Sequence, residues 1–280
     1  MSAVVMDGKA LAAKVKARAL AASGELKRKP GLAVILVGEN PASQVYVRGK
    51  VKDCADCGIV CFDFYLSADT TEEALLSLVA ELNERDDVDG ILCQLPLPVH
   101  ITEKKVLEAI SPDKDVDAFH PENMGRILRG DARFQPCTPA GVMELLREYG
   151  IEIAGKKCVV VGRSNIVGKP MALLLLGENG TVTVCHSRTP NLKEECLQAD
   201  ILVAAVGKVN LITADMVKEG AVVVDVAMNR NAEGKLCGDV DYAAVAEKAS
   251  YITPVPGGVG PMTRAMLMEN TLTAAKARQA

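Results

Sequence analysis

Short apolar runs alternate with segments of helical periodicity along most of this 280-residue chain. The first half has apolar runs at 32–37, 60–66 and 90–94, and the second at 157–161, 181–185, 201–206, 221–226 and 251–253. Helical patterns lie beside or between them at 9–20, 43–57, 71–83, 101–110, 140–149, 167–176, 192–199, 214–218 and 263–277. This alternation is typical of α/β proteins with a mostly parallel sheet.

A proline-rich segment divides the two series of runs. Residues 111–139 hold four prolines and little periodicity, so we interpret them as the crossing between two domains. We expect an N-terminal αβα substrate domain at 1–139, with the C-terminal helix (264–280) folding back onto it. Residues 140–263 are expected to form a Rossmann-type domain, because valine-rich runs without polar alternation suit strands covered on both faces. A cleft is expected between the domains.

Composition excludes several classes of protein. The net charge is −4 and Trp is absent, so nothing indicates nucleic-acid binding. No apolar run is long enough to span a bilayer, and the first residues lack the apolar core of a signal peptide, so we expect a cytoplasmic protein; a processed organellar form is the alternative. The nine cysteines are irregularly spaced. Cys54, Cys57 and Cys61 are compatible with a metal or redox motif, but ordinary buried thiols are favoured, and no metal is expected.

A glycine-bounded turn opens the second series of runs. Gly162 follows the run at 157–161, and Gly168 stands where the next helix begins. Backbone amides at such a helix N-terminus bind phosphate, although both residues are equally compatible with simple turn glycines. Because the turn opens a strand–helix series, a dinucleotide site is favoured.

The end of the next run indicates which dinucleotide is bound. Domains that prefer NAD usually place a carboxylate here, whereas this chain has Ser187 and Arg188, with Arg163 in the first turn. These groups suit a 2′-phosphate, so NADP is favoured over NAD. The alternative is that Arg188 is a solvated surface cation. His186 is interpreted as structural.

Polar side chains also follow the strands of the first half. Tyr46 and Lys50 lie four residues apart and share a helix face, Gln94 ends one run, and Asp117 follows the next helix. Ligands of open α/β sheets bind beyond the carboxyl ends of strands, so one pocket can receive all four. A phenol ring beside a lysine can hold a flat heteroaromatic substrate and move a proton on it.

Each of these residues has a simpler interpretation. Lys50 is compatible with a surface lysine, Tyr46 with a core residue and Gln94 with a strand cap. Asp115 and Asp117 are compatible with loop or cap residues, or with a pair of metal-binding carboxylates.

Taken together, these segments resemble the bifunctional methylenetetrahydrofolate dehydrogenase/methenyltetrahydrofolate cyclohydrolase family, the FolD type. The resemblance covers essentially the whole chain. It rests on residues 37–43 (VGENPAS) with Tyr46, Val47 and Lys50, and on 94–98 (QLPLP), 115–117 (DVD), 138–141 (TPAG), 162–170 (GRSNIVGKP) and 254–263 (PVPGGVGPMT).

The resemblance implies roles for particular residues. Lys50 is central to cyclohydrolase chemistry, Tyr46 stacks on the folate, Gln94 tunes the lysine and Asp117 binds the pterin. Further substrate contacts are implied for Ser43, Pro256, Gly257, Gly258 and Val259. Contacts with NADP are implied for Gly162, Arg163, Ser164, Ile166, Ser187, Arg188 and Met228.

Two positions depart from the family pattern. The family often has Gly where Ala118 and Ala227 stand in this chain. The added methyl group matters only where the backbone needs a positive φ or approaches a ligand closely.

The resemblance implies NADP-dependent oxidation of 5,10-methylenetetrahydrofolate to the 5,10-methenyl compound, followed by hydrolysis to 10-formyltetrahydrofolate. It also implies a homodimer formed through the NADP domain, for which the 221–226 run, read as an edge strand, is the expected contributor. The alternatives are a Rossmann dehydrogenase of the shikimate or amino-acid type, a non-catalytic NADP-binding protein, and an enzyme that keeps only one of the two activities.

Overall fold

The computed structural model describes residues 2–280, which divide into two compact units. Unit A comprises residues 13–137 and 264–280, and unit B comprises residues 2–12 and 138–263. Residues 2–12 were expected in the N-terminal domain but belong to unit B, because their strand pairs with the sheet of that unit.

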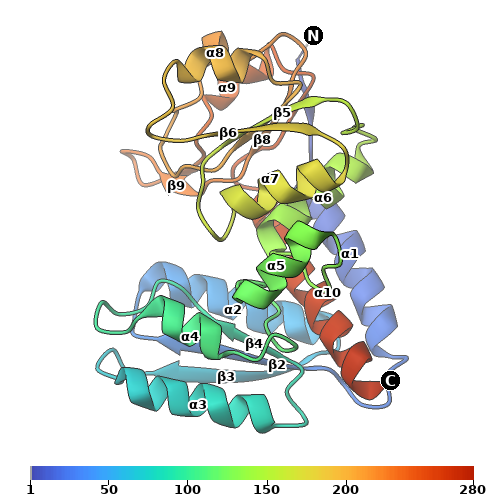
Figure 1. Cartoon of the computed structure of the whole chain (residues 1–280), viewed down its shortest axis with the longest axis vertical. Helices are drawn as coiled ribbons and strands as arrows, with labels where there is room; N and C mark the ends of the chain where they lie inside the picture. Colours follow the sequence, from blue (N-terminus) through green and yellow to red (C-terminus); the bar gives the residue numbers. More distant parts are fainter. Residues whose placement is uncertain (1) are drawn as a thin grey trace. The chain divides into compact units, whose positions relative to one another are not determined.

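Unit A contains a three-stranded parallel sheet in the order β3–β2–β4. The strands are β2 (Gly31–Val37), β3 (Val60–Leu66) and β4 (Gly90–Cys93). The helices assigned wholly or mainly to this unit are α1 (Gly8–Ser23), α2 (Pro41–Asp56), α3 (Glu72–Glu84), α4 (Glu103–Ala109), α5 (Pro121–Arg129) and α10 (Val259–Gln279). α2 lies along one face of the sheet and α3 along the other (Figure 1).

The central strand β2 shows why both faces of this sheet must be covered. All seven of its residues are buried. Leu32, Val34 and Leu36 belong to one apolar cluster with residues of α1, α2 and α10. Ala33, Ile35 and Val37 belong to a second cluster with residues of α3 and α4. The unbroken apolar run therefore reflects helices on both sides.

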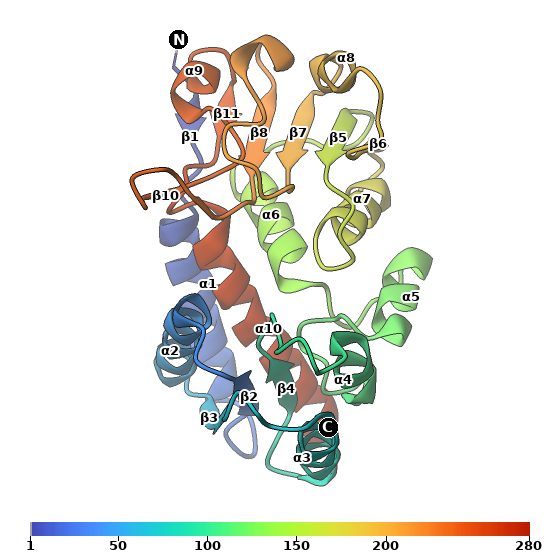
Figure 2. The same ribbon diagram turned by 90° about the vertical axis from the view of Figure 1, so that its left-hand side faces the viewer.

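Unit B contains a six-stranded parallel sheet in the order β1–β11–β8–β7–β5–β6, which Figure 2 shows side by side. Its strands are β1 (Val4–Val5), β5 (Lys157–Val161), β6 (Thr181–Cys185), β7 (Ile201–Ala204), β8 (Val222–Asp225) and β11 (Tyr251–Ile252). A small antiparallel pair joins β9 (Asn229–Arg230) to β10 (Leu236–Cys237). The remaining elements are α6 (Cys137–Glu148), α7 (Gly168–Gly177), α8 (Leu192–Leu197), η1 (Ala214–Met216) and α9 (Tyr242–Ala246). The order and direction of the strands confirm the predicted parallel α/β architecture.

One expectation about an individual segment is wrong, and another is incomplete. The 221–226 run was read as an edge strand, but β8 pairs with β7 on one side and β11 on the other. The proline-rich stretch 111–139 is more than a crossing, because it holds helix α5. Pro121 begins α5, and Gly130 ends it with a φ of 80°.

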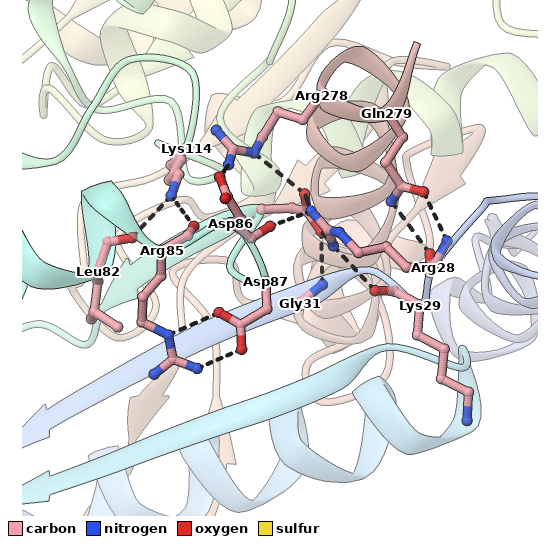
Figure 3. Close-up of polar contacts among 11 residues, drawn as sticks. Arg28, Lys29, Gly31, Leu82, Arg85, Asp86, Asp87, Lys114, Arg278 and Gln279 are labelled. Carbon is pink, nitrogen blue, oxygen red and sulfur yellow. Dashed lines mark hydrogen bonds and ion pairs between the residues drawn. The ribbon is translucent and has the colours of Figure 1, made fainter.

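A buried charge cluster in unit A ties together three segments that are distant in sequence (Figure 3). Asp89, which is fully buried, accepts two hydrogen bonds of 2.7 Å from Arg28 and one of 2.9 Å from the Gly31 amide. Arg278, near the end of α10, lies 3.5 Å from the same carboxylate.

Lys114 closes the C-terminal end of α3 beside this cluster. Its ammonium group donates to the carbonyl oxygens of Leu82 (2.9 Å) and Arg85 (2.7 Å), and burial lowers its pKa to about 8. Lys114 directly precedes the segment 115–117, so these bonds fix where that segment begins.

No helix among residues 2–280 combines the length and the apolar character that crossing a membrane requires.

Candidate active site

Lys50 and Gln94 meet at the carboxyl end of the unit A sheet. Lys50 lies on α2, is 8% exposed, and donates a hydrogen bond of 3.0 Å from Nζ to Gln94 Oε1. The amide of Gln94 is oriented for this contact, because its Nε2 donates to the carbonyl oxygen of Leu95 at 2.7 Å. The lysine therefore has a neutral acceptor as its direct partner.

Burial decides the protonation of the charged groups in this site. Burial lowers the pKa of Lys50, and the nearby Asp117 carboxylate opposes the shift. Burial raises the pKa of Asp117, while Lys50 and a hydrogen bond from Cys137 act in the opposite direction. Because desolvation dominates at both groups, each is biased toward its neutral form.

The loop that carries Asp117 is fixed by its neighbours. Asp115 accepts hydrogen bonds from the backbone amides of Phe119 (3.2 Å) and His120 (2.8 Å). Asn270, on α10, donates to the carbonyl oxygens of Val116 (2.8 Å) and Gln135 (2.9 Å). Asp115 is thus a loop-stabilising residue.

Of the two departures from the family pattern, only one falls where glycine has a conformational advantage. Ala118 has a φ of 58°, in the left-handed region, and its methyl group is buried in the core of unit A. Ala227 is not among the residues with positive φ in the described chain.

Tyr46 lies one turn before Lys50 on α2 and is half-buried. Burial raises the pKa of Tyr46, and the Arg264 guanidinium lowers it. Ser43, in the first turn of α2, is buried, and its amide donates to Asn40 Oδ1 at 3.1 Å.

Cys54 and Cys57, near the C-terminal end of α2, belong to the apolar core of unit A. Cys54 and Cys57 are fully buried, and burial raises the pKa of the Cys57 thiol to about 11. No three His, Cys, Asp or Glu side chains gather into a possible metal site within residues 2–280.

In unit B the predicted phosphate turn is shaped by close backbone packing. Gly162 has a φ of 131°, and a Cβ there would lie 2.2 Å from the carbonyl oxygen of Ala205. A Cβ on Gly168 would lie 2.2 Å from the carbonyl oxygen of Gly162. Ser164 Oγ accepts from the amides of Val167 (3.2 Å) and Gly168 (3.3 Å), so it caps α7. Both glycines are therefore required for this turn to form.

A pocket of about 290 Å³ lies beyond the carboxyl ends of β5, β6 and β7. Its lining residues are Val161, Gly162, Arg163, Ser164, His186, Ser187, Leu192, Ala205, Val206, Lys208 and Leu211. Leu192, Val206 and Leu211 supply apolar walls suited to a flat base. Arg163, Ser187 and Lys208 supply cations and a hydroxyl, and this lining contains no carboxylate. The donor set fits a 2′-phosphorylated dinucleotide.

The lining includes some of the residues predicted to contact NADP and omits others. Four of the predicted NADP residues line the pocket: Gly162, Arg163, Ser164 and Ser187. Ile166, Arg188 and Met228 are exposed and are not part of its lining. His186 and Lys208 line it but were not predicted. The rule that ligands bind at carboxyl ends would have pointed to Lys208, because it follows β7.

Two buried carboxylates hold the loops around this pocket. Asp239 accepts from the amides of Val206 (2.6 Å), Gly207 (3.0 Å) and Lys208 (2.6 Å). Asp225 accepts from the amides of Asp239 (3.1 Å) and Val240 (2.8 Å), and burial raises its pKa to about 6. Three backbone amides of the turn that carries Lys208 are therefore tied to one buried carboxylate.

The predicted substrate turn 256–259 belongs to unit B. The Gly258 amide donates to the carbonyl oxygen of Pro254 at 2.9 Å, and Gly257 has a φ of 112°. The peptide bonds before Pro96 and Pro256 are cis. The hydrogen bond at Gly258 and the positive φ of Gly257 make the substrate turn tight and dependent on glycine.

Each unit carries a site of its own: a buried lysine held by an amide in unit A, and a glycine turn beside a nucleotide-sized pocket in unit B. Together they define a two-unit α/β nucleotide-binding protein. The sequence profile of the tetrahydrofolate dehydrogenase/cyclohydrolase catalytic domain matches residues 6–117, and the profile of the NAD(P)-binding domain of that family matches residues 136–279. The chain belongs to the tetrahydrofolate dehydrogenase/cyclohydrolase family.

Individual relatives agree with this assignment. The chain is 60% identical to the bifunctional protein FolD of Ruminiclostridium cellulolyticum over 277 residues, which cover 98% of each chain. A crystal structure of the bifunctional enzyme FolD, methylenetetrahydrofolate dehydrogenase/cyclohydrolase, from Campylobacter jejuni is 52% identical, with a TM-score of 0.97 over 99% of this chain and 100% of that one. FolD of Trypanosoma brucei, solved with NADP cofactor and an inhibitor, is 42% identical, with a TM-score of 0.95 over 99% of this chain and 98% of that one.

Shikimate dehydrogenase represents the alternative class of Rossmann dehydrogenase, and it resembles this chain in fold alone. The enzyme from Aquifex aeolicus is 15% identical, with a TM-score of 0.52 over 89% of this chain and 97% of that one.

Proposed function

We propose that this chain is a bifunctional enzyme of one-carbon metabolism. It oxidises 5,10-methylenetetrahydrofolate to 5,10-methenyltetrahydrofolate with NADP⁺, and it hydrolyses the methenyl compound to 10-formyltetrahydrofolate. The observation that carries the proposal is the buried Lys50, bonded at 3.0 Å to the neutral amide of Gln94, in a chain that matches both family domains. Catalysis is assigned to Lys50, Tyr46, Gln94 and Asp117.

In the oxidation, the residues of the chain bind and align the folate. Tyr46 offers a ring face for stacking, and Asp117 accepts hydrogen bonds from the polar edge of the pterin. Ser43 and the turn formed by Pro256, Gly257, Gly258 and Val259 are assigned to folate contacts. When bound, NADP⁺ accepts the hydride that leaves the methylene carbon.

In the hydrolysis, Lys50 manages the proton. Water oxygen bonds to the methenyl carbon, and the neutral amine of Lys50 takes the proton that the water loses. The hydroxyl of the adduct then loses its proton as the carbonyl forms, the bond from this carbon to N5 breaks, and N5 is protonated. One proton is released overall. The lowered pKa of Lys50 raises the fraction of free amine available for this role.

The cofactor proposal rests on the unit B pocket. Arg163 and Ser187 are assigned to the 2′-phosphate, and Gly162 and Ser164 to the turn beside the phosphates. Ile166, Arg188 and Met228 are proposed as further contacts from the exposed rim. NADP is the preferred cofactor and NAD the weaker one.

A pair of absorbance assays tests the function. Methylenetetrahydrofolate with NADP⁺ is expected to yield NADPH, and NAD⁺ is expected to support a slower reaction. Methenyltetrahydrofolate alone is expected to disappear faster than in buffer. NADP binding without either reaction would favour the non-catalytic alternative, and one reaction alone would reduce the enzyme to a single activity.

We also propose that two copies associate through unit B. The open edges of its sheet in the described chain are β1 and β6, and β6 exposes Val184. An exposed edge strand offers unpaired backbone groups to a second copy. Sedimentation equilibrium is expected to give a dimer for the wild type and a monomer for Val184→Lys; a monomeric wild type would reject the proposal.

The cytoplasm is the proposed location. All nine cysteines are free thiols, seven of them buried, as expected for a protein of a reducing compartment.

A further inference from the structure

A glycine in the middle of α2 needs an explanation. Gly49 lies between Tyr46 and Lys50 on a 16-residue helix, where glycine is less favourable than alanine. A Cβ built on Gly49 would lie 2.0 Å from Arg264 Nη1. The missing side chain therefore leaves the space that the Arg264 guanidinium occupies.

Arg264 reaches through this space to a buried carboxylate. Its Nε lies 3.0 Å from Asp53 Oδ2, and the Asp53 side chain is 2% exposed whereas that of Arg264 is 34% exposed. The other oxygen of Asp53 accepts a hydrogen bond of 2.9 Å from Lys16 Nζ, on α1. Asp53 Oδ2 has no well-aligned hydrogen bond, so its contact with Arg264 is an ion pair. Removing one cation would leave a buried charge poorly compensated.

The same face of α2 carries the catalytic side chains. Lys50 is four residues after Tyr46, and Asp53 is seven residues after it. This helical spacing places Tyr46, Lys50 and Asp53 on one side of α2. Arg264 packs against this side at Gly49, within one turn of both Tyr46 and Lys50. Burial raises the pKa of Tyr46, and the charge of Arg264 opposes this rise, as expected for a cation near the phenol.

We propose that Arg264, on α10, is a positioning residue of the folate site. It fills the gap at Gly49 and, through its ion pair with Asp53, holds the α2 face that carries Tyr46 and Lys50 against α10. This inference rests on the proposed function for its catalytic consequence. The packing of Arg264 into the gap at Gly49 does not depend on it.

A double-mutant cycle tests the packing. Gly49→Ala in the wild type is expected to lower the melting temperature, because the methyl group displaces Arg264. In the Arg264→Ala background the same change is expected to raise the melting temperature by about 2–4 °C, since alanine then only improves the helix. An effect of the same sign in both backgrounds would overturn the proposal.

Kinetics and binding test the positioning. Arg264→Ala and Gly49→Ala are each expected to raise KM for folate by roughly tenfold in both reactions, and the double variant by no more than either. The affinity for NADP, measured by fluorescence titration, should not change, because its pocket lies in unit B. A purely structural role would lower the melting temperature without this selective change in KM.

Arg18 provides the matched control. It pairs with Glu269 at 3.4 Å between α1 and α10, but its side chain is 58% exposed. Arg18→Ala should leave KM and the melting temperature almost unchanged. A wild type that lacks both activities would reject the proposed function. The packing of Arg264 would still be tested by the melting temperatures of the double-mutant cycle. An active wild type with unchanged KM in the variants would reject the positioning role alone.

Discussion

The candidate sites of the two units are built in opposite ways. In unit A the important groups are buried ionisable side chains, and desolvation shifts the pKa of Lys50 downward and that of Asp117 upward. In unit B the pocket consists of backbone turns, apolar walls and the cationic side chains of Arg163 and Lys208, which are exposed.

This difference follows from what each site must do. Moving a proton requires a group whose pKa lies near the working pH, and burial supplies the shift. Binding phosphates requires charges that remain ionised and amides held in place, which exposed cations and a rigid turn supply. Substitutions in unit A should therefore change chemistry and pH dependence, whereas those in unit B should change cofactor affinity.

The largest effect is expected from removing the Lys50 amine in unit A. Lys50→Met should slow hydrolysis of methenyltetrahydrofolate by roughly 10²-fold or more, the usual contribution of a positioned proton-transfer group. The affinity for NADP should not change. Lys52→Met, on the exposed side of the same helix, is the control. Full hydrolytic activity of Lys50→Met would remove this lysine from the mechanism.

Next in size is a change of charge in unit B. Ser187→Asp places a carboxylate beside the proposed 2′-phosphate site, so the KM for NADP⁺ should rise by about tenfold or more while that for NAD⁺ changes little. Measuring kcat/KM with both cofactors gives the preference directly. An unchanged preference would show that the 2′-phosphate lies elsewhere.

The same assay ranks the cations of unit B. Lys208→Met is expected to reduce the preference for NADP⁺ more than Arg188→Met, because only Lys208 lines the pocket. The reverse ranking would favour the original sequence prediction for Arg188.

A smaller change is expected when Gln94 gains a charge. Gln94→Glu places a carboxylate at hydrogen-bond distance from Lys50 Nζ. The negative charge raises the pKa of Lys50 and so lowers the fraction of Lys50 that is a free amine near neutral pH. The hydrolysis rate should fall by about tenfold near pH 7 and recover as the pH rises. The pH profile of the wild type should rise at lower pH than that of the variant; coincident profiles would contradict the assigned role of Gln94.

The smallest effects compare one alanine in each unit. Ala118→Gly removes the conformational cost of a non-glycine residue with positive φ, but it also removes a buried methyl group. Because these two effects oppose each other, the free energy of unfolding should change by less than about 1 kcal/mol. Ala227→Gly gains no such relief and should be destabilising by about 1–2 kcal/mol. Chemical denaturation measures both. Equal losses would mean that the conformation of Ala118 carries no strain.

Much of this fold can be predicted from the sequence, because most strands have enough residues to show a pattern. The bounds of β3, β5 and β6 agree with their apolar runs to the residue. The strand β1 was not predicted, because what defines it is its pairing with β11, a long-range contact that leaves no local pattern. The interior position of β8 follows from its pairing with β7 and β11, which no local sequence pattern reveals.

The candidate site, too, could be predicted from the sequence only in part. The carboxyl-end rule grouped Tyr46, Lys50, Gln94 and Asp117, and the structure joins Lys50 to Gln94 and places Asp117 near enough to affect the pKa of Lys50. Arg264 could not be predicted, because nothing in its local pattern connects it with Gly49, more than 200 residues earlier. Lys208 was overlooked although the same rule applied to it.

The contacts of Asn270 also bear on how the chain folds while it is being synthesised. Its side chain donates to the carbonyl oxygens of Val116, next to Asp117, and of Gln135, which lie 154 and 135 residues upstream. In unit B, β1 likewise pairs with β11, near residue 251. Neither unit can therefore complete its core during synthesis of the first 250 residues, and the nascent chain must carry exposed apolar surface until then. We expect early translation arrest to leave both halves dependent on chaperones.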